Sequence, residues 1–422
     1  MKSIHVQIAS YRDYELLPTL RDCFLKSSGD VHINVGVVWQ RGDDETLGEF
    51  GNDNRVKVAP YDWKVSKGLG WARSIVQKFY DSEDYVLQLD SHHRFEKDWD
   101  ISLINMMKSV EEFSSKPLLT AYAAGYDPNN DKQLIPVPCK LLPRDFKESG
   151  TIWQNPTPIN NWQQLTKPIR GLFVSGHYYF TIGQFVQDYK YDPDMYFAGD
   201  EITLTVRSYT LGYDIYHPHR SLIYHHYGRL DRNKHWGDHT DKEKASGNIS
   251  QTWGELDSYS KKRIRQMLGQ ENNNIDLGEF GLGNVRSLDD FIRYSGMDTK
   301  RKIIHNDAIA GVEPPLIYKN EEDWERGFIK PFDITIKSWP RYQYIINENK
   351  YSHVKVEFVT LKRTINHVHN MTLDEVKGTK DNLYRRKFND VNLPHKIIFK
   401  GMNGENVVDS WETDVFPNTH WF

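Results

Sequence analysis

The first 125 residues alternate short apolar runs with amphipathic stretches, and this alternation constrains the fold more than any other feature of the sequence. Runs rich in β-branched and aromatic residues predict strands, and they occur at residues 4–10, 32–40, 56–62, 85–89 and 117–124. Apolar residues at helical spacing predict helices at 15–27, 68–80 and 99–113. Strands that alternate with helices are typical of an α/β fold with a mostly parallel sheet.

Two polar segments come directly after predicted strands, Ser10-Tyr11-Arg12-Asp13 and Asp90-Ser91-His92. Ligands of such sheets bind beyond the carboxyl ends of the strands, so we expect both segments on one rim. An aspartate and a histidine two residues apart at a strand end can point to the same side and reach one divalent cation. The alternative is that Asp90 caps a turn and His92 lies on the surface.

Two further groups carry candidate functional side chains. In the segment Tyr224-His225-His226-Tyr227, one histidine could complete a metal site, or the segment could pack through its aromatic rings and expose the imidazoles. Asp200 and Glu201 follow Gly199 at the start of a predicted helix. The helix dipole could simply favour acids at this position, or one carboxylate could orient or deprotonate an acceptor hydroxyl group.

A glycine-containing segment, Ser66 to Arg73, also precedes a predicted helix. Helix N-termini and arginines both suit phosphate contacts, although Gly-x-Gly alone is a weak signal.

Composition narrows the class of protein. The formal net charge is −4 and the sequence pI about 6.5, which argues against nonspecific binding to nucleic acid through bulk charge. Two cysteines, far apart in the sequence, exclude a disulfide framework and suggest a reducing compartment. No stretch reaches the ~18 apolar residues of a membrane span, and the N-terminus lacks an apolar core of signal-peptide length. We therefore expect a cytoplasmic protein.

The character of the sequence changes after about residue 315. The segments that follow read as strands, and they lie at residues 334–339, 342–346, 353–361 and 395–401. We therefore predict two domains, an α/β domain over residues 1–310 and a smaller β-rich domain of unknown role over residues 315–422.

Taken in order, several segments resemble the GlcNAc-transferase family that includes the cytoplasmic Skp1-hydroxyproline GlcNAc-transferase. They cover roughly residues 1–300 and read IHVQIASYRDYELLPTLRDC, VGVVWQ, SKGLGWARS, DYVLQLDSHHRFEKDWD, GLFVSGHYYF, MYFAGDE and RSLDDFIRYSGMD. A more distant similarity is to the polypeptide GalNAc-transferases. It rests on the Asp-Ser-His motif, the Gly-Leu…Ala-Arg segment, the acidic motif before a helix and a later histidine.

The resemblance implies a GT-A fold that uses UDP-GlcNAc and Mn²⁺ (or Mg²⁺). It implies that Asp90 and His92 bind the metal and that His225 or His226 is the third ligand, with His225 favoured. The donor would be held by a larger set of residues: Ser10, Tyr11 and Arg12 near the uridine, Arg73 near the uracil or pyrophosphate, Asp90 and Ser91 at the metal motif, and Gly176 and His177 in the sugar pocket. Asp200 or Glu201 would lie on the acceptor side.

The reaction implied by the resemblance retains the anomeric configuration. The departing UDP is stabilised by the metal and by cationic side chains, and its phosphate oxygen accepts the proton of the acceptor. The acceptor class stays open among protein hydroxyls, glycans, lipid-linked intermediates and modified nucleic acid. Two alternative functions are a carbohydrate-binding or structural module with a degenerate site, and a nucleotide-sugar hydrolase that uses the same Asp and His residues.

Overall fold

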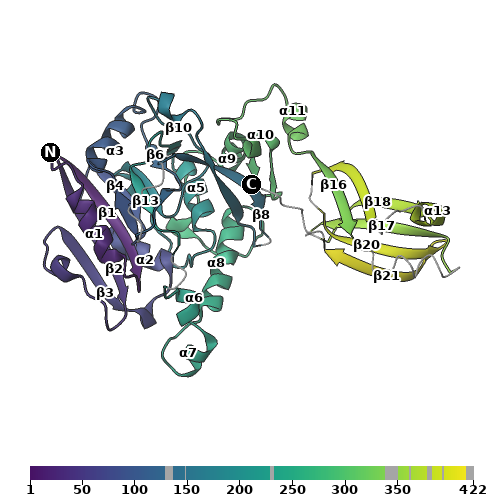
Figure 1. The fold of residues 1–422 in the computed structure, drawn as a ribbon, viewed down its shortest axis with the longest axis horizontal. Coiled ribbons are helices and arrows are strands. Elements are labelled where there is room, and N and C mark those ends of the chain that lie inside the picture. The colour runs from purple at the N-terminus through teal and green to yellow at the C-terminus, as the bar shows by residue number, and fades with distance from the viewer. Residues whose placement is uncertain are drawn as a thin grey trace. The chain divides into compact units, whose positions relative to one another are not determined.

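The computed structural model describes residues 1–128, 136–147, 149–228, 232–337, 350–360, 363–377, 383–391 and 394–414. The chain divides into two compact units, Met1–Ile317 and Tyr318–Phe422 (Figure 1). The division falls a few residues beyond the boundary predicted at 310–315. No described helix is long and apolar enough to cross a membrane.

An eight-stranded sheet forms the centre of the first unit (Figure 1). Its strands follow in space as β10 (Ile169–Arg170), β12 (Asp214–His217), β6 (Pro117–Thr120), β11 (Tyr178–Ile182), β4 (Tyr85–Leu89), β1 (Lys2–Tyr11), β2 (Val31–Arg41) and β3 (Val56–Asp62). Neighbours from β4 to β3 run parallel, as do β6 and β12. The predicted α/β fold is therefore observed.

The sheet is mixed, with four parallel pairs of strands and three antiparallel ones. Strand β11 runs antiparallel to both β4 and β6, and β10 runs antiparallel to β12. A parallel neighbour needs a crossover connection, usually a helix. Between β6 and β11 the described chain instead forms short strands and a hairpin, β8 (Cys139–Phe146) with β9 (Ile152–Pro158).

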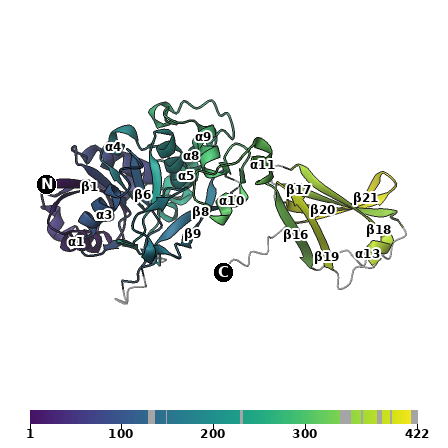
Figure 2. The same ribbon diagram turned by 90° about the horizontal axis from the view of Figure 1, so that it is seen from above.

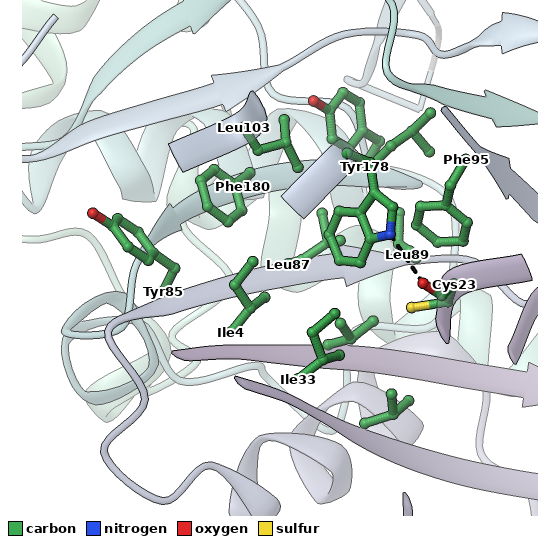
Figure 3. Close-up of a cluster of buried hydrophobic side chains, with 14 of the residues drawn as sticks. Ile4, Cys23, Ile33, Tyr85, Leu87, Leu89, Phe95, Leu103, Tyr178 and Phe180 are labelled. Atoms are coloured by element: carbon green, nitrogen blue, oxygen red, sulfur yellow. Dashed lines mark hydrogen bonds between the residues drawn. The ribbon is translucent and has the colours of Figure 1, made fainter. Parts of the chain in front are cut away.

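Both faces of the sheet are covered. Alternate residues of β1, such as Ile4 and Val6, pack with α1 (Leu16–Leu25) and α3 (Trp99–Lys108) in one core. Figure 3 shows part of this core, where the Trp99 Nε1–H donates to the Cys23 carbonyl at 3.0 Å. The opposite face packs against α2 (Leu69–Val76), α4 (Phe185–Asp188) and α5 (Asp200–Thr210).

Smaller elements surround the sheet. A second sheet has the order β5 (His93–Phe95), β13 (Ile223–His225), β7 (Ala124–Gly125), and a third joins β14 (Met297–Asp298) and β15 (Ile303–Ile304). The remaining α-helices of this unit are α6 (His235–Asp238), α7 (Asp241–Ala245), α8 (Trp253–Met267), α9 (Leu288–Ser295) and α10 (Asn306–Ala310). The 3₁₀ turns are η1 (Gly48–Gly51), η2 (Trp63–Val65), η3 (Gln77–Phe79), η4 (Trp162–Gln164) and η5 (Gly278–Phe280).

Two predicted helices end early. The helix predicted at 99–113 stops at Lys108, and the chain continues in tighter turns such as Val110 N–H to Met107 C=O at 3.1 Å. The helix predicted at 68–80 is α2 followed by η3. Apolar spacing alone does not separate an α-helix from the 3₁₀ turns that often end it.

The second unit is β-rich, as predicted (Figure 2). A four-stranded antiparallel sheet has the order β18 (Ile365–Thr372), β17 (His353–Thr360), β20 (Pro394–Asn403), β21 (Asn406–Asp414), and β16 (Lys330–Lys337) pairs with β19 (Leu383–Asp390). The unit also contains α11 (Glu321–Arg326) and α13 (Leu373–Lys377). Its core includes Val356, Phe358 and Phe399. The strand predicted at 342–346 lies outside the described residues.

Candidate active site

Asp90, His92 and His225 converge at the carboxyl end of β4. Their candidate ligand atoms all lie within 4.8 Å of one another. The two Nε2 atoms are 2.9 Å apart, and Asp90 Oδ2 lies 3.5 Å from each. The Asp90 side chain is 29% exposed whereas both imidazoles are nearly buried, so the cluster opens on the aspartate side. One oxygen and two nitrogens form a donor set that suits Mn²⁺ and related divalent ions.

Asp13 fixes the orientation of His92. Its Oδ2 accepts hydrogen bonds from His92 Nδ1 at 2.9 Å and from Ser91 Oγ at 2.6 Å. An ionised carboxylate only accepts, so the proton of His92 lies on Nδ1 and the lone pair lies on Nε2, facing Asp90 and His225. Carboxylates that hold metal-binding histidines in this way raise their basicity and set their tautomer.

Strand pairing selects His225 over His226 for the cluster. In the antiparallel pair β5–β13, His225 lies opposite His93, which brings it next to His92. The backbone N–H of His226 donates to the His92 carbonyl at 3.1 Å, and its ring packs against Tyr126. Successive strand side chains point to opposite faces, so the two histidines separate.

Two more imidazoles surround the cluster. His93 Nδ1 bonds to the Asp90 carbonyl at 3.0 Å, and the His177 ring centroid lies 4.4 Å from that of His225. His177 Nε2 accepts from the Ala123 N–H at 3.2 Å, so that nitrogen is engaged by the backbone. Burial, followed by the nearby His225, lowers the pKa of both His93 and His177 well below the usual range.

Asp90 stays ionised in this setting. Burial alone would raise its pKa, but His225, His92 and Arg73 outweigh that effect and lower the pKa well below the usual range. A charged carboxylate is the form that binds a cation, so the electrostatics of the cluster favour a metal ligand.

Arg73 is buried between the metal cluster and the acidic helix. Its side chain is 1% exposed, and its Nη1 lies 2.5 Å from Asp200 Oδ2. Its Nη2 lies 3.5 Å from Asp90 Oδ1 and also donates to the Gly176 carbonyl. The guanidinium therefore joins two segments that the sequence presented as separate motifs.

The glycines before Arg73 do not form a phosphate cradle. The N–H groups of Leu69 and Gly70 donate to the carbonyls of Tyr196 and Met195, at 2.9 and 3.0 Å. A Cβ on Gly70 would come within 2.4 Å of the Met195 carbonyl oxygen. The Gly-x-Gly pattern therefore reflects close packing of α2 on this segment, and the phosphate interpretation of these glycines is wrong.

The segment before β11 leaves the sheet and is held by side chains. The N–H groups of Val174, Ser175 and Gly176 donate to Thr205 Oγ1, Thr120 Oγ1 and Glu201 Oε1, at 2.9, 2.9 and 3.0 Å. The sequence of residues 171–183 has strand character, and these hydrogen bonds explain why the strand β11 forms only from Tyr178. At Gly176 an added Cβ would lie 2.9 Å from Asp200 Oδ2, so only glycine fits without displacement.

Glu201 is held by three donors. Besides the Gly176 N–H, its Oε2 accepts from Tyr122 Oη at 2.8 Å and Gln154 Nε2 at 3.0 Å. Burial raises its pKa to about 7, an effect that the hydrogen bonds from Gly176 and Tyr122 partly offset. Burial likewise raises the pKa of Asp200, which is engaged by Arg73. With a pKa of about 7, the Glu201 carboxyl group gains and loses its proton near neutral pH.

The end of β1 and the residue after it reach a different side chain, Asp238 of α6. Tyr11 Oη and Arg12 Nη1 both donate to Asp238 Oδ2 at 3.0 Å, and the Arg12 guanidinium lies 5.1 Å from the centre of the Trp63 ring. Ser10 is buried, and its carbonyl accepts from Gln40 Nε2 at 2.9 Å. Through Asp13, this segment is continuous with the metal cluster.

Sequence reasoning did not assign roles to Asp13, Asp238, Tyr122 or Gln154. For Asp13 a signal existed, because it follows a strand on the same rim as Asp90. The other three act through contacts with residues 47–227 positions away, which no local pattern reveals.

Comparison with known proteins gives a family. A family model described as "Glycosyltransferase (GlcNAc)" matches residues 3–52 and 49–301, which together exceed half of the chain. No curated protein matches the sequence.

Among solved structures, the chain is similar to GalNAc-T7 with UDP, GalNAc and Mn²⁺, at 15% identity and a TM-score of 0.46, over 69% of this chain and 54% of that one. It thus spans about half the length of that protein. It is also similar to TarS of S. aureus in complex with UDP-GlcNAc, at 15% identity and a TM-score of 0.36, over 65% of this chain and 74% of that one.

Proposed function

Because the chain belongs to the GlcNAc glycosyltransferase family, we propose that it transfers GlcNAc from UDP-GlcNAc to a hydroxyl group of an acceptor in a reaction that requires a divalent cation. The observation that carries the proposal is the convergence of Asp90, His92 and His225, with His92 held by Asp13. Packing alone does not require these three side chains to direct their ligand atoms toward one point.

In this proposal Asp90, His92 and His225 hold Mn²⁺ (or Mg²⁺). The donor set fits, because one carboxylate and two neutral imidazole nitrogens suit such ions and the Nε2 lone pair of His92 already points into the cluster. When bound, the cation supplies positive charge that stabilises a diphosphate leaving group. Ser91 supports the same site through its hydrogen bond to Asp13.

The donor would extend from the metal cluster along residues 10–13. Ser10, Tyr11 and Arg12 lie on the uridine side in this proposal, since Asp13 links them directly to His92. Gly176 and His177 line the sugar side. Arg73 holds Asp90 and Asp200 in position through its ion pairs, so its guanidinium is not free to bind the donor.

Glu201 would face the acceptor. It is linked to the metal cluster through Gly176 and Arg73, and its raised pKa lets it donate or accept a hydrogen bond near neutral pH. We propose transfer with retention, in which the phosphate oxygen of the leaving UDP accepts the acceptor's proton. Glu201 then orients the hydroxyl group, and Asp200 positions Arg73.

The acceptor stays a protein or glycan hydroxyl in this proposal. Support for a cytoplasmic reaction comes from the low cysteine content alone. A nucleotide-sugar hydrolase would use the same residues, so acceptor dependence has to be measured.

The test is UDP release from UDP-GlcNAc, UDP-GalNAc and UDP-glucose, with MnCl₂ or EDTA, for the wild type and for Asp90→Ala, His92→Ala and His226→Ala. We expect Mn²⁺-dependent release that Asp90→Ala and His92→Ala abolish, whereas His226→Ala retains it. Full activity in EDTA, or in the Asp90→Ala protein, would refute the proposal. UDP release that no acceptor candidate increases would identify a hydrolase.

A further inference from the structure

Tyr227 places an aromatic ring beside the metal cluster. It follows His225, the last residue of β13, by two positions. Its ring centroid lies 4.2 Å from that of His225, and the ring stands nearly perpendicular to that of His177, with centroids 5.9 Å apart. The residue is nonetheless 52% exposed. An aromatic ring is therefore held at the surface next to a candidate metal ligand.

The two ends of the Tyr227 side chain have the reverse of the usual environment. Tyrosine normally buries its ring and turns its hydroxyl group toward water. Here Oη donates to the Ala123 carbonyl at 2.9 Å and lies 3.4 Å from His177 Nε2. Burial also raises the pKa of the Tyr227 hydroxyl above its usual range. The exposure thus belongs mainly to the carbon atoms of the residue, and an apolar ring faces the solvent.

The backbone of Ala123 holds this ring in place. Its carbonyl accepts from Tyr227, and its N–H donates to His177 Nε2 at 3.2 Å. The two residues that follow, Ala124 and Gly125, form β7 and pair with β13, which leads directly to Tyr227. A side chain that is held before a ligand arrives loses little conformational entropy when the ligand covers it.

The position of the ring favours the sugar side of the proposed site. Nε2 of His225 lies 2.9 Å from that of His92, the ligand that is tied to the uridine side at residues 10–12. Tyr227 instead contacts His177, which the proposed function gives to the sugar side. In a nucleotide sugar the pyranose ring is bonded to the phosphate that the cation would hold. It must therefore lie close to the metal ligands.

We propose that the exposed face of the Tyr227 ring stacks on the pyranose ring of the nucleotide-sugar donor. This inference rests on the proposed function and adds a residue that binds the sugar part alone. A pyranose ring carries C–H groups on its faces and hydroxyl groups around its edge. An aromatic ring can therefore cover the apolar face while the hydroxyl groups stay available to polar side chains.

Isothermal titration calorimetry on the full-length protein with MnCl₂ tests the proposal. The ligands are UDP-GlcNAc, UDP-glucose and UDP, which differ in whether a sugar is present. The variants are Tyr227→Ala and Tyr227→Phe. Tyr259→Ala is the matched control, because Tyr259 is a 43% exposed tyrosine on α8. Mn²⁺ affinity without nucleotide is measured by electron paramagnetic resonance.

The expected loss is confined to ligands that carry a sugar. Tyr227→Ala should weaken UDP-GlcNAc and UDP-glucose about tenfold, as the loss of roughly 55 Å² of buried apolar surface would. It should leave the affinities for UDP and Mn²⁺ unchanged. Tyr227→Phe keeps the ring and should retain most of the affinity for both UDP-sugars. Tyr259→Ala should bind every ligand as the wild type does.

Four results would overturn the inference, and they have different meanings. Wild-type binding of both UDP-sugars by Tyr227→Ala would leave the proposed function intact. Equal losses for UDP and UDP-GlcNAc, or a loss of Mn²⁺ affinity, would show that the ring supports His225 rather than the sugar. Binding by Tyr227→Phe as weak as that by Tyr227→Ala would assign the effect to the hydroxyl group. A wild-type protein that binds neither UDP nor UDP-GlcNAc would refute the proposed function itself.

Discussion

Replacing Asp13 by asparagine tests whether His92 is held as a metal ligand. Asp13 is 3% exposed and accepts from His92 Nδ1 and Ser91 Oγ through the same oxygen, Oδ2. Its Oδ1 accepts from the Glu15 N–H at 3.1 Å, which orients an asparagine with its NH₂ group toward His92. An NH₂ group donates, so it favours the His92 tautomer with the proton on Nε2, the atom that faces Asp90 and His225.

The expected loss is in metal affinity. Removing a side chain that orients a metal ligand weakens binding about 10- to 100-fold, which is about 1.4–2.7 kcal/mol. We therefore expect the MnCl₂ concentration for half-maximal UDP release to rise by that factor in Asp13→Asn. Free Mn²⁺ measured by electron paramagnetic resonance should show the same shift without any acceptor or donor present.

Asp100→Asn is the matched control. Asp100 is fully buried and accepts from Ser28 N–H at 2.9 Å and Ser28 Oγ at 2.8 Å, at the start of α3. Both variants replace a buried carboxylate by a neutral amide, so the remaining hydrogen bonds lose their charge assistance and both proteins should lose stability, by roughly 1 kcal/mol for each such bond. Only Asp13→Asn should lose Mn²⁺ affinity. Wild-type Mn²⁺ binding in Asp13→Asn, or an equal shift in Asp100→Asn, would refute the role given to Asp13.

Three further predictions concern neighbouring residues. His225→Ala should abolish Mn²⁺ binding measured by paramagnetic resonance while His226→Ala retains it, and the reverse result would exchange their roles. Arg73→Met should destabilise the first unit by about 3–5 kcal/mol in urea unfolding, because it leaves buried Asp200 unpaired, and adding Asp200→Asn should recover part of that loss. The pKa of Glu201, about 7, lies above that of an unfolded glutamate, so its contribution to stability is present below about pH 4.5 and is lost as pH rises through 7. Glu201→Gln should therefore gain stability relative to the wild type as pH rises across this window, and parallel pH profiles of the two proteins would contradict this.

Much of the fold could be predicted because its elements carry local signals. Strands β3 and β4 have the predicted bounds 56–62 and 85–89, where turn-forming residues flank runs of strand-forming ones. The direction of β11 could not be predicted in the same way. Its sequence indicates which side chains lie on each face of the strand. Its antiparallel pairing with β4 depends instead on the path of the chain between β6 and β11.

The candidate metal site was predictable only in part. Asp90 and His92 stand two residues apart at a strand end, so their spacing suffices to bring them together. The choice between His225 and His226 needs the register of β13 against β5, because a shift of one residue exchanges the faces of the strand. Spacing left both histidines open, and the family resemblance favoured the one that the register brings to Asp90.

Arg73 shows why a charged motif does not reveal its own environment. A glycine-rich segment followed by an arginine at the start of a helix suits phosphate binding, and the sequence offers no sign that the glycines pack against residues 195–196 instead. Once α2 is packed there, Arg73 is buried, and a buried guanidinium requires a carboxylate partner. Asp200 meets that requirement, and Asp90 lies within 3.5 Å of the same guanidinium. The arginine thus links the acidic start of α5 to the metal cluster. This buried ion pair helps to hold the neighbouring Glu201 beside Gly176.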